Sequence, residues 1–293
     1  MSQSSLPQPD PAGASAAAIQ AHYDVGNAFY RLWLDESQTY SAALWSGLDD
    51  QRDLAWAQRN KIAWHMESAN VGAARRVLDI GCGWGSTIKA CALQPKVERA
   101  VGLTLSEAQA NQVRGEANAK LEVRLESWQE HQPAAPYDSI ISIGAFEHFT
   151  KPADDGAAKI AIYRDFFRHC RDWLTPKGAL SLQTIAYGSL RRDDPNVAMM
   201  SQIFPESDLP RLEEIVVACD QLFEIVMVRN DRHDYARTCE TWALNLRAKR
   251  SEAIALVGKE QVQRYERYLK LSAFGFLTGK LWLLRLKLVP LPA

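Results

Sequence analysis

Apolar and polar residues alternate along this chain in a way that predicts two kinds of elements. Between residues 75 and 185, short apolar runs the length of a strand are separated by segments with helical spacing. The strands are expected at 76–80, 99–105, 121–125, 138–143 and 179–185, and the helices at 86–93, 106–119 and 158–173. Strands and helices that alternate at this pitch predict a parallel sheet covered by helices on both faces.

The chain before and after this region is less regular. Residues 1–16, rich in Ser, Pro, Ala and Gln, are expected to form a disordered tail. Residues 17–70 carry aromatic and apolar positions before the first strand, which predicts an N-terminal helical cap over a ligand. Residues 71–293 are expected to form the α/β core, in which the irregular, proline-containing stretch at about 186–206 lines an acceptor pocket.

The C-terminal third predicts a helix at about 208–221, a strand at 222–228 and helical structure over 234–273. In the tail 280–289, Arg285 and Lys287 alternate with leucines, as on a strand with one face toward water. We therefore expect this tail to form the last strand of the sheet, running antiparallel. An interfacial membrane helix is the alternative interpretation.

Composition narrows the class of protein. With 293 residues, 47% apolar and a net charge of −1, the chain can bury a large core and has no basic field for nucleic acid. The sequence contains no run of about 18 apolar residues and no secretory signal, so we expect a cytoplasmic protein. The five cysteines lack paired or metal-ligand spacing, which predicts reduced thiols and no metal site.

The most informative stretch is residues 77–85, Val-Leu-Asp-Ile-Gly-Cys-Gly-Trp-Gly. A buried strand here runs into a turn with Gly81, Gly83 and Gly85, where a ligand can approach the backbone because no Cβ fills the space. The stretch lacks the last glycine of the dinucleotide fingerprint and the Gly-Lys-Ser/Thr of a phosphate loop. We interpret it as a site for S-adenosylmethionine; an ordinary tight turn is the alternative.

Five segments together resemble the cyclopropane fatty acid and mycolic acid cyclopropane synthase family. They begin at His22, Asp79, Gly102, Ser142 and Asp234 and read HYDVGN, DIGCGWG, GLTLSEAQ, SIGAFEHF and DYARTCETW. The resemblance extends from about residue 21 to residue 270. It implies an α/β fold of the class I methyltransferase (Rossmann-like) type: a seven-stranded mixed sheet with helices on both faces and an N-terminal helical cap.

The resemblance also assigns roles in binding S-adenosylmethionine. Gly81 and Gly83 would admit its methionine part, and Tyr40 from the cap would close over it. Thr104 and Gln109 would meet the ribose. The remaining cofactor contacts expected are Trp128 near the adenine, Ala145 at the amino acid end, and Ser41, Asp79 and Gly85 around them.

The family transfers a methyl group to an alkene carbon, and a bound bicarbonate held by a Cys, a Glu, a His and a Tyr removes a proton. This chain has Ala42 in place of the Cys and Gln183 in place of the His, whereas Glu147 and Tyr235 are present. Fewer donors hold a buried anion less well, which predicts a weakened bicarbonate site. Alternatively, Glu147 or His148 acts directly as the base.

A carbocation formed on the acceptor would be stabilised by aromatic faces. The candidates are Tyr23, Trp33, Tyr40, Phe146 and Tyr235. The resemblance predicts methyl transfer to a carbon of an apolar lipid-like or isoprenoid acceptor, with ring closure left open. The alternatives are an N- or O-methyltransferase of a small natural product and a non-catalytic homologue that only binds the cofactor.

Transient contact with a membrane or an acyl carrier is possible on this sequence. Arg191-Arg192 and Lys249-Arg250 are small basic patches that could meet phosphates, although ordinary solvated charge explains them better. The sequence does not indicate an oligomeric state.

Overall fold

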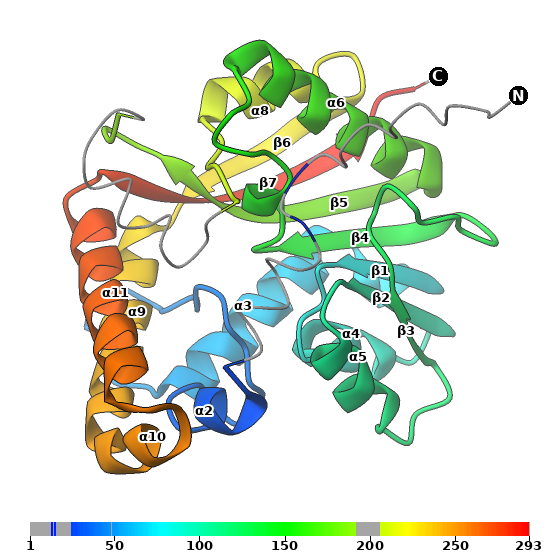
Figure 1. Ribbon diagram of the computed structural model, residues 1–293. Coiled ribbons are helices and arrows are strands. Elements are labelled where there is room, and N and C mark those ends of the chain that lie inside the picture. The colour runs from blue at the N-terminus through cyan, green and yellow to red at the C-terminus, as the bar shows by residue number, and fades with distance from the viewer. Residues whose placement is uncertain (1–12, 14, 16–24, 48, 192–205, 293) are drawn as a thin grey trace, which may run out of the picture.

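The computed structural model describes residues 13, 15, 25–47, 49–191 and 206–292. Its centre is a seven-stranded sheet with the order β3-β2-β1-β4-β5-β7-β6 (Figure 1). The strands are β1 (Arg76–Ile80), β2 (Arg99–Thr104), β3 (Leu121–Leu125), β4 (Tyr137–Ile143), β5 (Leu174–Tyr187), β6 (Phe223–Asn230) and β7 (Leu281–Pro290). The first five run parallel, and the strand order reverses direction at β1, between β2 and β4.

The tail predicted as the last strand is β7, which lies between β5 and β6 and runs antiparallel to both. The alternative of a membrane-surface helix is therefore wrong. The prediction of a wet face is also wrong for Arg285, which is 0% exposed, whereas Lys287 is partly exposed. β7 is buried on both sides because it lies inside the sheet and carries helices on both faces.

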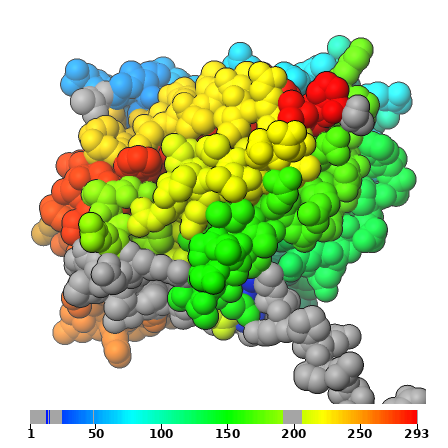
Figure 2. All heavy atoms as spheres, turned by 90° about the horizontal axis from the view of Figure 1, so that it is seen from above, coloured from blue at the N-terminus to red at the C-terminus, as the bar shows by residue number. Residues whose placement is uncertain are grey.

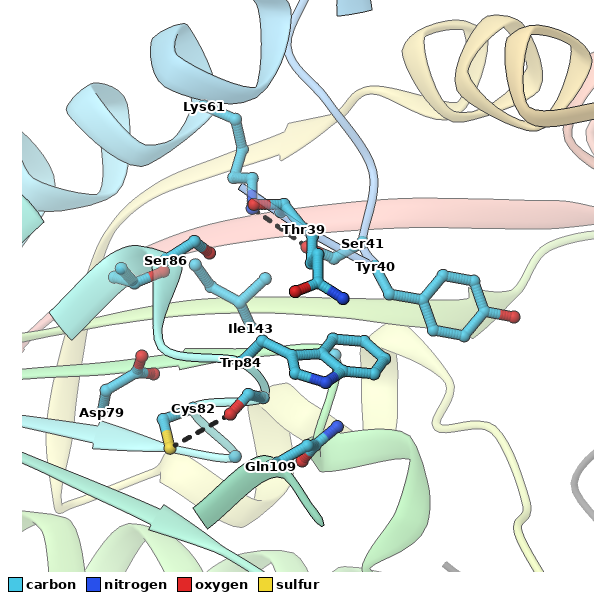
Figure 3. Close-up of a pocket in the computed structure, with 15 residues that line it drawn as sticks. Thr39, Tyr40, Ser41, Lys61, Asp79, Cys82, Trp84, Ser86, Gln109 and Ile143 are labelled. Atoms are coloured by element: carbon cyan, nitrogen blue, oxygen red, sulfur yellow. Dashed lines mark hydrogen bonds between the residues drawn. The ribbon is translucent and has the colours of Figure 1, made fainter. Parts of the chain in front are cut away.

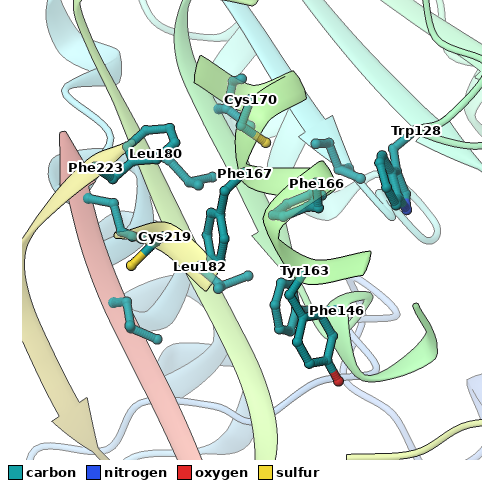
Figure 4. Close-up of a cluster of buried hydrophobic side chains, with 14 of the residues drawn as sticks. Trp128, Phe146, Tyr163, Phe166, Phe167, Cys170, Leu180, Leu182, Cys219 and Phe223 are labelled. Carbon is teal, nitrogen blue, oxygen red and sulfur yellow. The ribbon is translucent and has the colours of Figure 1, made fainter. Parts of the chain in front are cut away.

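Helices cover both faces of the sheet, as the alternating pattern predicts. On one face lie α3 (Leu54–Ser68), the 3-10 turn η1 (Val71–Ala73), α4 (Ser86–Ala92) and α5 (Glu107–Arg114). On the other lie η2 (Phe146–His148), α6 (Gly156–Trp173) and α8 (Leu212–Cys219). Figure 4 shows the aromatic core on this second side, where Phe146, Phe166 and Phe167 pack with Tyr163 of α6.

A separate helical layer lies beyond the carboxyl ends of the parallel strands (Figure 1). It combines α2 (Asn27–Arg31) with three C-terminal helices, α9 (Arg232–Ala248), α10 (Arg250–Val257) and α11 (Lys259–Leu277). The two parts share one buried cluster, in which the Tyr30 and Tyr265 hydroxyls hydrogen-bond at 2.8 Å. The predicted N-terminal cap is thus completed by helices that the domain prediction assigned to the core.

Several element boundaries differ from the predicted ones for local reasons. The helix expected over 106–119 ends at Arg114, before Gly115. The helical region 234–273 is divided into three helices, the last two separated by Gly258 with φ +82°. Most of the predicted disordered tail 1–16 and most of the predicted acceptor-pocket insertion at 186–206 lie outside the described residues.

The outer surface carries no helix suited to crossing a membrane, as far as the described residues show. Figure 2 shows the face formed by α6 in green and by the chain from α8 to β6 in yellow. β6 is one of the two edge strands of the sheet, and Val226 and Met227 on it are exposed. All five cysteines are buried and unpaired, in agreement with the expected reduced thiols.

Candidate active site

The glycine-rich turn after β1 is fixed by hydrogen bonds to the neighbouring strand. The backbone N–H groups of Gly81 and Cys82 both donate to the Leu103 carbonyl, at 3.0 and 2.9 Å. Gly81 has φ +83°, and a Cβ there would lie 2.5 Å from the Ala145 Cβ. Gly83 has φ +54°, and a Cβ there would meet no atom within 4 Å. Gly81 therefore permits close packing against the turn after β4, while open space lies over Gly83.

This geometry predicts the effect of Gly81→Ala. Both the contact with Ala145 and the left-handed backbone oppose a Cβ, so the turn must shift. We expect affinity for S-adenosylhomocysteine to fall by at least about tenfold, equivalent to about 1.4 kcal/mol, in calorimetric titration. Gly47→Ala is the matched control, because Gly47 has φ +105° with open space around it. Equal losses of affinity in both variants would contradict the role of the turn.

A pocket opens above the turn (Figure 3). Its wall includes six of the predicted cofactor residues: Tyr40, Ser41, Asp79, Gly81, Gly83 and Gln109. The other lining residues are Gln38, Thr39, Lys61, Cys82, Trp84, Ser86, Thr87, Ile143 and Gly144. Six of the residues predicted to bind the cofactor therefore lie together at the switch point of the sheet, where open α/β folds bind ligands.

Helix α3 holds the cap segment at the pocket wall. The Gln58 side-chain amide donates to the carbonyls of Thr39 and Ser41, at 3.2 and 2.9 Å. Lys61 Nζ donates to Ser41 Oγ at 2.9 Å. The two Gln58 bonds fix the backbone on both sides of Tyr40, so its ring is placed by α3.

The cap also contacts the glycine turn directly. Trp84 Nε1 donates to Asn27 Oδ1 at 3.0 Å, and the rings of Trp84 and Tyr30 lie 5.1 Å apart. Gln112 of α5 donates to Gln38 Oε1 at 2.6 Å. Asn27 ends the HYDVGN segment, and this bond gives that residue a positioning role that the sequence did not specify.

On the ribose side predicted by the resemblance, Thr104 and Gln109 form a pair. Thr104 Oγ1 donates to Gln109 Oε1 at 2.8 Å and accepts from the Ser106 backbone N–H at 3.1 Å. Gln109 lines the pocket, and Thr104 supports it from behind. Their contact with a ribose stays a prediction.

Two charged groups face the pocket from opposite elements. Asp79 at the end of β1 is 2% exposed, and burial raises its pKa to about 7. Lys61 of α3 is 1% exposed, and burial lowers its pKa to about 7, with the charge of Arg285 acting in the same direction. Both groups are costly to keep charged until a ligand of complementary charge approaches.

Glu147 lies in η2, directly after the strand end of β4. Its side chain is buried, and Thr184 Oγ1 donates to Glu147 Oε2 at 3.0 Å. A Cβ on Gly144, a lining residue, would lie 3.8 Å from Glu147 Oε1 and 3.9 Å from Ser41 Cβ. Burial raises the pKa of Glu147 to about 7. Glu147 is not among the residues that line the pocket, but its carboxyl group, which can accept a proton near neutral pH, lies next to Gly144, which is.

Gln183, which replaces the family's His, belongs to a buried polar network on the α3 side of β5. Gln183 Oε1 accepts from Arg285 Nε at 2.8 Å and lies 3.3 Å from His65 Nε2. Arg285 also donates to the Ala42 and Ala43 carbonyls, at 3.3 and 2.9 Å, and to Asp231 at 2.5 Å. The guanidinium thus joins both positions at which this chain departs from the family's bicarbonate ligands.

The remaining candidates lie in packed surroundings. A His148 ring nitrogen is 2.6 Å from Ser207 Oγ, and burial lowers the pKa of His148 to about 4. Trp128 does not line the described pocket; its ring packs against Phe149 and Phe166 at 5.3 and 5.5 Å. Gly85 is also outside the lining residues, and a Cβ there would meet Val113.

The predicted aromatic faces divide between two clusters. Tyr235 stacks on Phe276 at 4.4 Å and belongs to the cap layer with Trp33 and Tyr40. Phe146 stacks on Tyr163 at 4.3 Å in the core under α6. Phe146 is therefore separated from the cap aromatics, and Tyr23 lies outside the described residues.

Sequence reasoning missed Lys61, His65 and Arg285. A signal was present in α3, whose buried face carries Leu54, Gln58, Lys61, Ile62 and His65 at helical spacing. Polar residues at the buried positions of a helix indicate a polar site beneath it. No comparable local signal existed for Arg285, because its burial depends on β6, α3 and α9 packing around β7.

The strand order with its single antiparallel strand between β5 and β6, and the glycine turn at the switch point, define a class I S-adenosylmethionine-dependent methyltransferase. Comparison with known proteins specifies the family. The model of the family described as mycolic acid cyclopropane synthetase matches residues 12–286. The chain belongs to this family, as its motifs predict, and is an enzyme of the cyclopropane synthase type that uses S-adenosylmethionine.

Characterised relatives match over nearly the whole chain. Cyclopropane mycolic acid synthase 2 of Mycobacterium bovis is 32% identical over 271 residues, covering 86% of this chain and 87% of the relative. Cyclopropane mycolic acid synthase 1 of Mycobacterium tuberculosis is 33% identical over 290 residues, covering 92% and 96%. The crystal structure of mycolic acid cyclopropane synthase CmaA1 with SAH and CTAB superposes with a TM-score of 0.83 at 31% identity, covering 94% and 98%.

Proposed function

We propose that this enzyme methylates a carbon of an apolar, unsaturated acceptor without closing a ring, and that Glu147 takes the released proton. The observation that carries the proposal is the position of Glu147: a buried carboxyl group, held by Thr184, next to Gly144 of the cofactor pocket. No bound bicarbonate is required in this account.

The aromatic residues of the cap layer favour an apolar acceptor. Trp33, Tyr40 and Trp242 contact one another, with ring centroids 5.3 to 5.7 Å apart, and Tyr40 also lines the cofactor pocket. Aromatic faces stabilise a positive charge without forming a bond to it. Such a layer suits an alkene that carries positive charge after methylation.

The altered anion site supports proton transfer to the protein itself. Ala42 has no side-chain donor, and the Gln183 oxygen is occupied by Arg285 and His65. Of the four positions expected to hold bicarbonate, only Glu147 and Tyr235 keep the family's residue types. A buried anion needs several directed hydrogen bonds, so bicarbonate is disfavoured here.

The proposed reaction balances without a further reactant. S-adenosylmethionine would supply an electrophilic methyl group: the π electrons of the acceptor form the new carbon–carbon bond while the methyl–sulfur bond breaks, and S-adenosylhomocysteine leaves with that electron pair. The neighbouring acceptor carbon becomes positive and then loses a proton from an adjacent carbon to Glu147, which restores a double bond. Removal of a proton from the transferred methyl group would instead close a cyclopropane ring.

The test is an acceptor panel with methyl-labelled cofactor and purified protein. Unsaturated phospholipids, acyl chains on a carrier protein, polyprenyl compounds and amines are each incubated, and products are identified by mass spectrometry and proton NMR. We expect label in an unsaturated acceptor, with vinyl protons retained. Cyclopropyl protons would overturn the claim of no ring closure, and label transferred only to amines would overturn carbon methylation.

A further inference from the structure

Lys61 is a buried amine whose positive charge is compensated only at a distance, by Asp35 and Asp79. It is 1% exposed, and its one side-chain hydrogen bond among the described residues goes to the neutral Ser41 hydroxyl. Within the same residues, no carboxylate lies within the 4.0 Å of an ion pair. A buried ammonium group without a counter-ion is strongly disfavoured, so its retention calls for a specific role.

That role is not to hold the cap segment. Gln58 already donates to the Thr39 and Ser41 carbonyls, and Asn60 donates to the Leu44 carbonyl at 2.9 Å. These three bonds fix the segment that carries Tyr40. Lys61 is not needed for this arrangement. What its side chain adds is an amine that can carry a positive charge at the pocket wall.

The position of Lys61 indicates what its charge meets. Figure 3 shows Lys61 extending from α3 on one side of the pocket and Asp79 lying on the other, beside the glycine turn. The pocket thus presents a cation and an anion, each almost fully buried, on opposite walls. A ligand that carries a carboxylate and an ammonium on one carbon complements both.

We propose that Lys61 receives the α-carboxylate of the methionine end of S-adenosylmethionine, with Asp79 facing its ammonium group. The inference rests on the cofactor site of the proposed function and holds for any acceptor. It makes Lys61 the residue by which the enzyme distinguishes the intact cofactor from adenosyl ligands that lack a carboxylate.

Truncated ligands test this directly by calorimetry on the full chain. The probes are S-adenosylhomocysteine, its decarboxylated analogue, which keeps the amine, and methylthioadenosine, which lacks the whole amino acid end. In the unaltered enzyme, loss of the carboxylate should weaken binding on the order of 10- to 100-fold, as expected for a charged hydrogen bond. Equal affinity for the first two probes would overturn the proposal.

The variant Lys61→Met tests whether Lys61 is the residue that recognises the carboxylate. We expect it to weaken S-adenosylhomocysteine by roughly 10- to 100-fold and to change affinity for the decarboxylated analogue by less than about threefold. Lys89→Met is the control, because Lys89 lies on neighbouring α4 and pairs with Glu116 outside the pocket. Equal weakening of both ligands by Lys61→Met would assign Lys61 a merely structural role and overturn the proposal.

A replacement variant and the pattern of probe binding distinguish failure of the Lys61 role from failure of the proposed function. If Lys61→Met does not fold, Lys61→Gln replaces it, and the ligand comparison in the unaltered enzyme still decides. If the unaltered enzyme binds none of the three probes, the cofactor site itself fails, which is a failure of the proposed function. If it binds them without regard to the carboxylate, only the role of Lys61 fails.

Discussion

Replacement of Glu147 by Gln is expected to lower kcat for methyl transfer by roughly 10²- to 10⁴-fold, the usual contribution of a positioned general base. The amide keeps the size of the side chain and can still meet Thr184, but it cannot accept the proton. Affinity for S-adenosylhomocysteine should change by less than about threefold, because the loss affects only the transition state.

The pH profile gives a second measure of the same role. Burial raises the pKa of Glu147 to about 7, and the base form is the deprotonated one. The rate in the unaltered enzyme should therefore rise with pH through about 7 and level off above it, and Glu147→Gln should lose this dependence. His148→Gln is the comparison, since His148 is bonded to Ser207 and is the alternative base. A larger loss in His148→Gln than in Glu147→Gln would contradict the assignment.

Arg285→Met is expected to destabilise the fold by about 3–5 kcal/mol, the cost of removing one partner from a buried charge network. Arg285 is 0% exposed and donates to Gln183, Asp231 and the backbone of the cap segment. Without it, the two buried carbonyls of Ala42 and Ala43 lose the Arg285 donor, and Asp231 keeps its bonds from Arg229. The expected fall in melting temperature is roughly 6–20 °C.

Arg229→Met is the matched control for stability. Arg229 also pairs with Asp231, at 3.0 Å, but its side chain is 37% exposed. An exposed pair contributes about 0–1 kcal/mol, so this variant should melt close to the unaltered protein. Thermal and denaturant unfolding of both variants provide the measurement. Equal stability of Arg285→Met and the unaltered protein would show that the network does not join the cap to the sheet.

The sequence predicted the parts of the fold that depend on local patterns. β1 and β3 begin and end at the predicted residues, because each is a short segment with strand-like apolar positions between polar turns. The turn at Gly81 and Gly83 is predicted from the glycines themselves. Both residues have a positive φ, which glycine adopts without strain. The family motifs then supplied the strand order, which no local pattern contains.

The features that the sequence did not predict depend on distant packing. The alternation of Arg285 with leucines indicates a wet face, but β6 and the helices around β7 bury that position. Lys61 meets Ser41 twenty residues earlier and shares the pocket with Asp79 from a different strand. Such polar groups are distinguishable from ordinary surface charges only when the tertiary contacts are known.

The central claim is that Glu147, and not bicarbonate, accepts the proton in methyl transfer. The most direct test measures turnover of an accepted unsaturated substrate in buffer depleted of carbon dioxide, with and without added bicarbonate. If Glu147 accepts the proton, the rates in the two conditions are equal, and Glu147→Gln loses nearly all turnover under both. A rate that collapses on depletion and is restored by bicarbonate would contradict it.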